Sequence, residues 1–499
     1  MRGPSQPGAR PHRDPGADGT TCHGRGSHAD LEVTARWVRR IVLGVVLTVI
    51  GRTAWLVGER EWRRLRGERA FAATAAQVDA TDPNWRWGDL NTKRLQVPGD
   101  RNSAAVIPAI RAATPPNWDR LWDGPDADRQ PPLLPNVRLP VRDRDAAARV
   151  LAAAPEAVRL SRGLKDFPSG RRDYDLAPNV VDTLLPDVQH TREVARTLKW
   201  DAWVAADGGD APRAADALAA ALNASRSVGD EPFLISQLVR LATRATMVRT
   251  LERVLAQTAR PDHLAALRLP ALQQALGEDA AEPLALYGIR GERATFDVLA
   301  QRLGDRAIDI SSIAGTDGDD GFPVQAGWWL YCGRLAEDRE FCLSWLNSAA
   351  AAAALPVHEQ PAAFDALPPV VQDENRVLLK LLPAVDKVAA AYWRNVAEVN
   401  CAVVAVACER FRLTHARWPG VLAELCPEFL PAVPIDPFSG QPIRYTKCLD
   451  GVVTHSCGPK SPTRPPPKTH PGLPDDIRIG FRLWNPDARR LDPPPEATP

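Results

Sequence analysis

The residues best suited to bind an ion are Asp317, Asp319 and Asp320, which lie with two glycines in one short segment. Clustered carboxylates on a turn suit Ca²⁺, which prefers oxygen ligands. An EF-hand loop counted from Asp317 requires a bidentate Glu at its twelfth position, where this chain has Trp328. We therefore interpret the segment as a solvated acidic turn, with a weak calcium site as the alternative.

The usual signatures of catalysis are missing from the sequence. His358-Glu359-Gln360-Pro361 begins like a zinc-protease motif, but the second histidine of that motif does not follow. The chain also has no phosphate-binding glycine loop and no nucleophile elbow. The sequence thus predicts no catalytic residue, no metal site and no cofactor, and we expect a protein that is not an enzyme.

Seven of the eight cysteines follow residue 330, and no two of them form a Cys-x-x-Cys pair, which disfavours a zinc ribbon. Cys401 and Cys408 are seven residues apart, so we expect them on one buried helix face. Cys448 and Cys457 are expected near each other across a hairpin. One or two disulfides in an oxidising compartment, or burial as small apolar side chains, both remain open.

Composition limits the functions and the folded extent of the chain. The 499 residues carry a formal charge of +1, which gives no electrostatic reason to expect nucleic-acid binding. Prolines cluster at residues 114–140, 459–474 and 487–499 and indicate linkers or tails. Because the N-terminal region has few aliphatic side chains, we expect residues 1–35 to be disordered, and the same for residues 485–499.

One apolar segment, residues 41–58, is predicted to cross a lipid bilayer within a transmembrane helix at 36–60. Its 18 residues span about 27 Å as a helix, close to the roughly 30 Å hydrocarbon core. Ten Leu, Ile and Val residues favour insertion by about 0.3 to 0.6 kcal/mol each, whereas Arg52 opposes it by about 2.5 to 3.5 kcal/mol if central. A cleaved signal peptide and a buried soluble helix are the alternatives.

The middle of the chain is predicted to be helical. Residues 61–142 form a helix and a Pro-rich connection, in which Trp85 and Trp118 each follow a Pro-Asn turn and are expected to pack in the core. Apolar residues then recur at helical spacing, and residues 143–375 are predicted to form a domain of helical hairpins. Asp207-Gly208-Gly209-Asp210 is the expected turn of one hairpin, and residues 230–232 start another helix.

Residues 376–484 are predicted to form an α+β module. A helical pattern runs from Arg376 to His415, and a short helix follows Trp418-Pro419 at residues 421–426. Alternating residues at 443–445 and 452–455 predict a β-hairpin, and residues 475–481 a returning strand. The segment between them contains a compact set of turn and aromatic residues: Trp418, Pro419, Pro434, Asp436, Pro437, Phe438, Gly440 and Tyr445. We expect structural roles for these residues.

This order of elements resembles the globular domain of type II secretion major pseudopilins over about 75 residues. The resemblance implies a long helix packed on a small antiparallel sheet. The chain departs from that pattern because more than 300 residues separate its apolar segment from the module, and because Pro459 and Lys460 stand where an acidic calcium loop is expected. Polymerisation into a pilus and calcium binding are therefore not expected.

The whole chain also resembles uncharacterised membrane-anchored proteins of planctomycete-type bacteria. The resemblance rests on three short motifs: Asp82-Pro83 with Trp85-Arg86, Asp230-Glu231-Pro232, and Gly291-Glu292-Arg293-Ala294. It implies an envelope location but no activity. We expect one crossing of the cell membrane, with the large C-terminal part extracytoplasmic. The Arg residues on the two sides of the segment are nearly equal in number and do not fix its orientation.

Three functions follow as hypotheses. The first is a non-enzymatic, single-pass envelope protein that contacts the bilayer through residues 41–58 and acts as an interaction scaffold for unknown protein partners. The second is a component associated with type II secretion or pili. The third is an unrecognised hydrolase, with candidate groups at residues 317–320. The fold class in each case is mostly α, with a transmembrane helix, a helical-hairpin domain and the α+β module.

Overall fold

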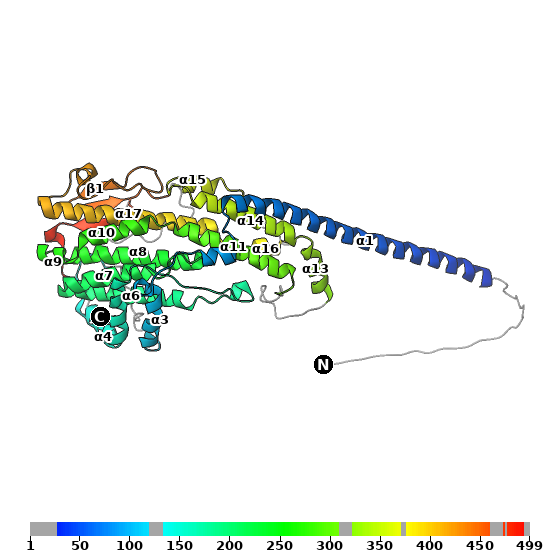
Figure 1. The fold of residues 1–499 in the computed structure, drawn as a ribbon, viewed down its shortest axis with the longest axis horizontal. Coiled ribbons are helices and arrows are strands. Elements are labelled where there is room, and N and C mark those ends of the chain that lie inside the picture. The colour runs from blue at the N-terminus through cyan, green and yellow to red at the C-terminus, as the bar shows by residue number, and fades with distance from the viewer. Residues whose placement is uncertain are drawn as a thin grey trace, which may run out of the picture. The chain divides into compact units, whose positions relative to one another are not determined.

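A computed structural model describes residues 27–118, 133–308, 322–370, 376–459, 473–474 and 477–493. The predicted fold class is confirmed at the coarse level: the chain is mostly helical, begins with one long apolar helix, and carries a small three-stranded antiparallel sheet. Figure 1 shows the order of the elements. The chain divides into two units, residues 1–62 and 63–499, and the following description of packing concerns the second.

Helix α1 runs without a break from Ser27 to Thr81, and its part from Arg63 onward belongs to the second unit. There it packs closely on α14, since a Cβ added to Gly67 would lie 2.7 Å from the backbone nitrogen of Glu337. The helix ends before Asp82-Pro83, as expected, because proline supplies no N–H and restricts the residue before it.

The helices up to residue 304 form most of the second unit. Their bounds are α2 (Trp87–Thr92), η1 (Gly99–Arg101), α3 (Ser103–Ala113), α4 (Val141–Ala152), α5 (Pro155–Gly163), η3 (Leu164–Asp166), η4 (Val180–Asp182), α6 (Pro186–Gly208), α7 (Ala211–Arg226), α8 (Leu234–Gln257), α9 (Pro261–Ala266), α10 (Leu269–Ala280) and α11 (Leu284–Gly304). The turn predicted between α6 and α7 is confirmed. Gly209 adopts a φ of +80°, and the side chain of Asp210 accepts a hydrogen bond from the backbone N–H of Arg213 at 3.1 Å.

The later elements are α13 (Phe322–Cys332), α14 (Leu335–Ala353), α15 (Gln360–Asp365), α16 (Val377–Lys380), α17 (Val385–His415), η5 (Leu422–Leu425) and η6 (Pro486–Ala488). The single helix predicted from Arg376 to His415 is wrong at its start. It is broken at residues 381–384, where Pro383 cannot donate a helical hydrogen bond. The short helix expected at 421–426 is the single 3₁₀ turn η5.

Helix α17 lies between the sheet on one side and α8 and α10 on the other (Figure 1). Its apolar side chains are buried at helical spacing, among them Val388, Val396, Val399, Val403 and Phe411. One hydrophobic cluster contains residues of α7 and α8 together with residues of α17 and the sheet. The boundary drawn at residue 375 therefore does not separate two hydrophobic cores.

The sheet has the order β1 (Arg444–Cys448), β2 (Gly451–His455) and β3 (Gly480–Trp484), all antiparallel. The predicted hairpin is confirmed, with Tyr445 opposite Thr454. The returning strand begins at Gly480, later than expected. The first residue of β2 must be glycine, because a Cβ at Gly451 would lie 2.0 Å from the carbonyl oxygen of Leu483.

Residues 485–493, expected to belong to a disordered tail, are part of the folded second unit. Arg489 is 4% exposed, and its guanidinium pairs with the buried carboxylate of Glu409 on α17 at 2.8 Å. Burial alone would raise the pKa of Glu409, but Arg489 and Arg412 hold it below its usual range. Residues 1–26 and 494–499 lie outside the described part of the chain.

Candidate functional site

The three motifs that suggested the planctomycete-type group meet in one place, at the end of α1. Asp82 accepts hydrogen bonds from Nε and Nη2 of Arg290 at 2.9 and 2.6 Å, and it also pairs with Arg293. Arg293 is 2% exposed, and its guanidinium lies 5.9 Å from the ring centre of the fully buried Trp85. The first and third motifs are thus joined by the ion pair between Asp82, which follows α1, and Arg293 of α11. We call this region the motif junction, comprising residues 82–86, 230–232 and 291–294.

The second motif contacts the third through backbone atoms. A Cβ added to Gly291 would lie 1.8 Å from the carbonyl oxygen of Pro232, so only glycine permits this approach of α11. The neighbouring Glu292 accepts a hydrogen bond from the backbone N–H of Leu234, the first residue of α8, at 3.2 Å. Burial raises the pKa of Glu292 to about 7.

Acidic residues of the second motif are also paired with arginines. Asp230 pairs with Arg94 at 2.8 Å, and the fully buried Glu231 pairs with Arg172 at 3.3 Å. Burial raises the pKa of Glu231, and Arg172 partly offsets this. The motif junction therefore has the properties of a structural joint, since Asp82, Asp230 and Glu231 face guanidinium groups and Glu292 accepts a backbone N–H.

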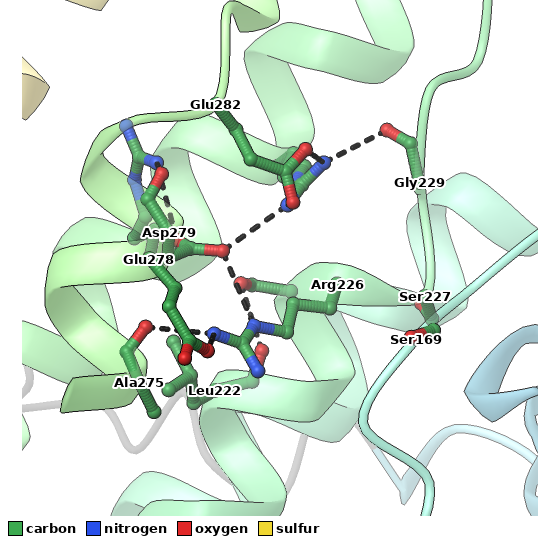
Figure 2. A network of polar contacts seen from close by, with 12 residues as sticks. Ser169, Leu222, Arg226, Ser227, Gly229, Ala275, Glu278, Asp279 and Glu282 are labelled. Carbon is green, nitrogen blue, oxygen red and sulfur yellow. Dashed lines mark hydrogen bonds and ion pairs between the residues drawn. The ribbon is translucent and has the colours of Figure 1, made fainter. Parts of the chain in front are cut away.

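A second buried ionic network, centred on Asp279 of α10, ties α7, α8 and α10 together. The Asp279 carboxylate is fully buried and contacts Arg226, Arg240 and Arg244 at 3.3, 3.1 and 3.1 Å. Figure 2 shows Asp279 above Arg226, with Glu278 and Glu282 at the edge of the network. Burial alone would raise the pKa of Asp279, but the three arginines lower it to about 2.

Carbonyl oxygens satisfy other donors of this network. Arg226 donates to the carbonyl of Ala275 at 2.7 Å, and Arg240 donates to that of Gly229 at 2.9 Å (Figure 2). Sequence reasoning did not find this network. The available signal was Arg240 and Arg244, one helical turn apart inside an apolar helical pattern, where unpaired arginines are rarely buried.

The turn residues singled out in the C-terminal module meet around Asp436. This buried carboxylate accepts hydrogen bonds from the backbone N–H groups of Phe438 (3.1 Å) and Cys457 (2.9 Å) and from the hydroxyls of Ser439 (3.2 Å) and Ser456 (2.8 Å). The carboxylate thereby connects the turn with the end of β2. Its hydrogen-bonding capacity is used within the protein.

The other residues of that motif serve the same local structure. Pro437 is buried, and the carbonyl of Pro434 accepts the N–H of Ile443 at 2.9 Å. Gly440 adopts a φ of +68°, which glycine favours.

Trp418 and Tyr445 fasten the turn after α17 to the sheet. The Trp418 indole donates to Asn485 at 2.7 Å, and the Tyr445 hydroxyl donates to the carbonyl of Pro419 at 2.9 Å. Five of the eight residues thus belong to the turn around Asp436, and Trp418, Pro419 and Tyr445 belong to the contacts after α17.

The apolar part of α1 is the remaining candidate for function. Among the described residues, helix α1 is both long enough and apolar enough to cross a membrane. Its most apolar part has no buried side chain. The exposed apolar residues include Trp37, Ile41, Leu43, Leu47, Val49, Ile50 and Trp55. Arg52 lies within this segment.

Other predicted sites have different outcomes. The acidic turn at 317–320 lies outside the described residues. His358 and Glu359 lie in the turn before α15, with 3.7 Å between the imidazole and the carboxylate. Cys401 and Cys408 are fully buried, as expected, whereas the thiols of Cys448 and Cys457 are free. Among the described side chains, no group of three or more His, Cys, Asp or Glu residues is placed to hold a metal ion.

Comparison with known proteins identifies no relative: the chain matches no known family, no curated protein and no solved structure.

Proposed function

We propose that the chain is a non-enzymatic, single-pass envelope protein, in which residues 41–58 hold it in the bilayer and residues 63–499 act as an interaction scaffold. The observation that carries this proposal is the apolar window of α1, none of which is buried against protein. An apolar surface of this kind is stable in lipid and unfavourable in water.

The energetics of insertion support an anchor with a narrow margin. Ten aliphatic residues contribute about 3 to 6 kcal/mol together, and a central Arg would oppose this by about 2.5 to 3.5 kcal/mol. Arg52 lies toward the C-terminal end of the segment, where its long side chain can extend to the headgroups at a lower cost.

The buried and partly buried charges of the second unit support a structural role for that unit. Asp82, Asp279 and Glu409 each face at least two arginines, and Glu231 faces Arg172. Paired groups of this kind fix the positions of helices and are poorly placed to transfer protons. A scaffold requires helices in fixed positions, because these helices carry its binding surface.

A role in type II secretion is the second candidate, and the helix-plus-hairpin order of residues 385–455 favours it. The burial of α17 argues for the scaffold instead. A pseudopilin-like helix would continue into the apolar anchor, whereas α17 follows Pro383 and is covered by α8 and α10. An orientation with the large unit outside the cytoplasm is part of the first proposal.

In-cell crosslinking of the full-length protein, followed by membrane extraction and mass spectrometry, tests the scaffold proposal. Reporter fusions at residue 30 and residue 499 give the orientation in the same strain. The scaffold proposal expects reproducible protein partners that are lost on deletion of residues 41–58. Recovery of an inner-membrane secretion assembly would favour the second candidate, and turnover of an envelope substrate by the purified full-length protein would contradict both.

A further inference from the structure

The two outer strands of the sheet, β1 and β3, differ in how their free edges are covered. In an antiparallel sheet, alternate residues of an outer strand direct their backbone N–H and C=O groups away from the neighbouring strand. On β3, the outward-facing N–H of Arg482 donates to the carboxylate of Glu252 on α8 at 2.8 Å. The carbonyl of Trp484 accepts a hydrogen bond from Nε of Arg489 at 2.9 Å. Side chains of the protein thus cover the edge of β3.

The strand register identifies the outward-facing residues of β1. Because Arg482 faces outward on β3, its partner Val453 on β2 directs its backbone groups toward Thr446 of β1. Tyr445 and Lys447, on either side of Thr446, therefore direct theirs to the outer edge of β1. Among the described residues, these backbone N–H and C=O groups have no hydrogen-bond partner. We call this row of backbone groups the open edge.

The charged side chains of β1 are both cations. Arg444 and Lys447 are exposed, and neither forms an ion pair with a carboxylate of the described chain. The acidic groups near the strand are already paired: Asp450, in the β1–β2 turn, with Arg482, and Glu424 of η5 with an arginine at 2.7 Å. Because side chains alternate along a strand, Arg444 and Lys447 lie on opposite faces of the sheet. The open edge is therefore flanked by one cation on each face.

We propose that the open edge binds an acidic, extended segment of a partner protein as a fourth strand of the sheet. The backbone of Tyr445 and Lys447 supplies the hydrogen bonds, and two carboxylates, three residues apart in the partner, lie opposite Arg444 and Lys447. A second copy of this chain fits the edge poorly, because pairing β1 with β1 would bring two Arg444 and two Lys447 side chains together. The inference rests on the proposed scaffold function and names the chemistry of its partner.

The test is fluorescence anisotropy on the full-length protein in an uncharged detergent. The probe is a labelled octapeptide with blocked ends, Val-Thr-Glu-Val-Thr-Glu-Val-Thr, and in the control peptide lysine replaces both glutamates. We expect saturable binding of the acidic peptide below about 1 mM, weakened by added salt, and at least about tenfold weaker binding of the basic peptide. Absence of binding, or equal binding of the two peptides, overturns the proposal.

Two substitutions at Lys447 separate the role of the charge from that of the backbone. Lys447→Ala removes one cation and should weaken binding of the acidic peptide several-fold. Lys447→Pro also removes an outward-facing N–H that the sheet does not use, and should weaken binding by about a further tenfold with the circular dichroism spectrum unchanged. Lys387→Ala, at an exposed lysine in the first turn of α17, is the control and should bind like the parent. Equal affinities of the parent and the folded proline variant contradict the proposal.

Sedimentation velocity of the peptide-free protein tests the other occupant of the open edge. We expect the parent and Lys447→Pro to sediment alike. A dimer that Lys447→Pro abolishes would assign the edge to a second copy of the chain and overturn the acidic partner. The peptide measurements require neither insertion into a bilayer nor a cellular partner. Failure of peptide binding therefore leaves the membrane anchor intact, and failure of the anchor leaves peptide binding intact.

Discussion

At the scale of single residues, the second unit depends on carboxylates whose ionisation is fixed by their neighbours. Asp279 is buried with three arginines, and its pKa is lowered to about 2. A group with a lowered pKa contributes stability that is present above its unfolded value and is lost as the pH falls through its folded value. The contribution of Asp279 is therefore complete at neutral pH and declines below about pH 4.

Replacement of Asp279 tests this network. Asp279→Asn should lower the free energy of unfolding at pH 7 by about 3 to 5 kcal/mol, because three buried guanidinium groups lose a shared anion. Denaturant unfolding followed by circular dichroism measures the change. Asp262→Asn, in an exposed pair with Arg260, is the control and should leave stability nearly unchanged. Similar effects of the two substitutions would contradict the account.

The raised pKa of Glu292 predicts a contribution to stability with the opposite dependence on pH. Because its pKa is raised to about 7, it stabilises the fold fully below about pH 4.5, and this contribution is lost as the pH rises through 7. Glu292→Gln keeps an oxygen that can accept the Leu234 N–H. The variant should be roughly 3 kcal/mol more stable than the parent at pH 8 and within about 1 kcal/mol of it at pH 5. Denaturant midpoints that differ equally at both pH values would show that the ionisation of Glu292 is not responsible.

At the scale of elements, the close backbone approach at Gly291 fixes the position of α11 against the start of α8. Gly291→Ala forces a Cβ to within 1.8 Å of the Pro232 oxygen, and rigid backbone atoms must move to avoid it. We expect a loss of about 2 kcal/mol or more. Gly277→Ala in α10 is the matched control, since its Cβ meets no atom within 4 Å and should stabilise the helix by up to about 1 kcal/mol. Thermal unfolding distinguishes the two signs.

Elements set by local chemistry were predictable from the sequence. The α6–α7 turn follows from Gly209 and the Asp210 cap, and the β1–β2 hairpin follows from alternating residues. The break before α17 was missed because the apolar spacing continues across Pro383. In that case the helical periodicity outweighed the proline in the prediction, although proline determines the structure.

The candidate sites were harder to predict because they join distant parts of the chain. Asp82 and Arg293 are 211 residues apart, and the ion pair between them requires α1 and α11 to be packed together first. Arg489 reaches Glu409 from a segment whose prolines and charges resemble a tail. In contrast, the Asp436 turn was predictable in kind, since its partners Phe438 and Ser439 are sequence neighbours.

At the scale of the whole molecule, the proposed function assigns one task to each unit: attachment to lipid for the first and a fixed binding surface for the second. At the end of α1, within the second unit, Trp85 donates a hydrogen bond to Asp79 and Asp82 accepts one from Arg290. The membrane-anchored scaffold thus depends most directly on whether residues 41–58 are embedded in a bilayer.

Alkaline carbonate extraction of membranes measures this embedding. The full-length protein should remain in the membrane pellet, and so should Val46→Ala. Val46→Asp should move much of the protein to the supernatant, because an acidic residue near the centre of the segment costs about 2.5 to 3.5 kcal/mol and removes the narrow margin for insertion. Val46 is exposed, so the substitution leaves the protein core unaltered. Release of the unmodified full-length protein by carbonate would contradict the membrane anchor and the function proposed from it.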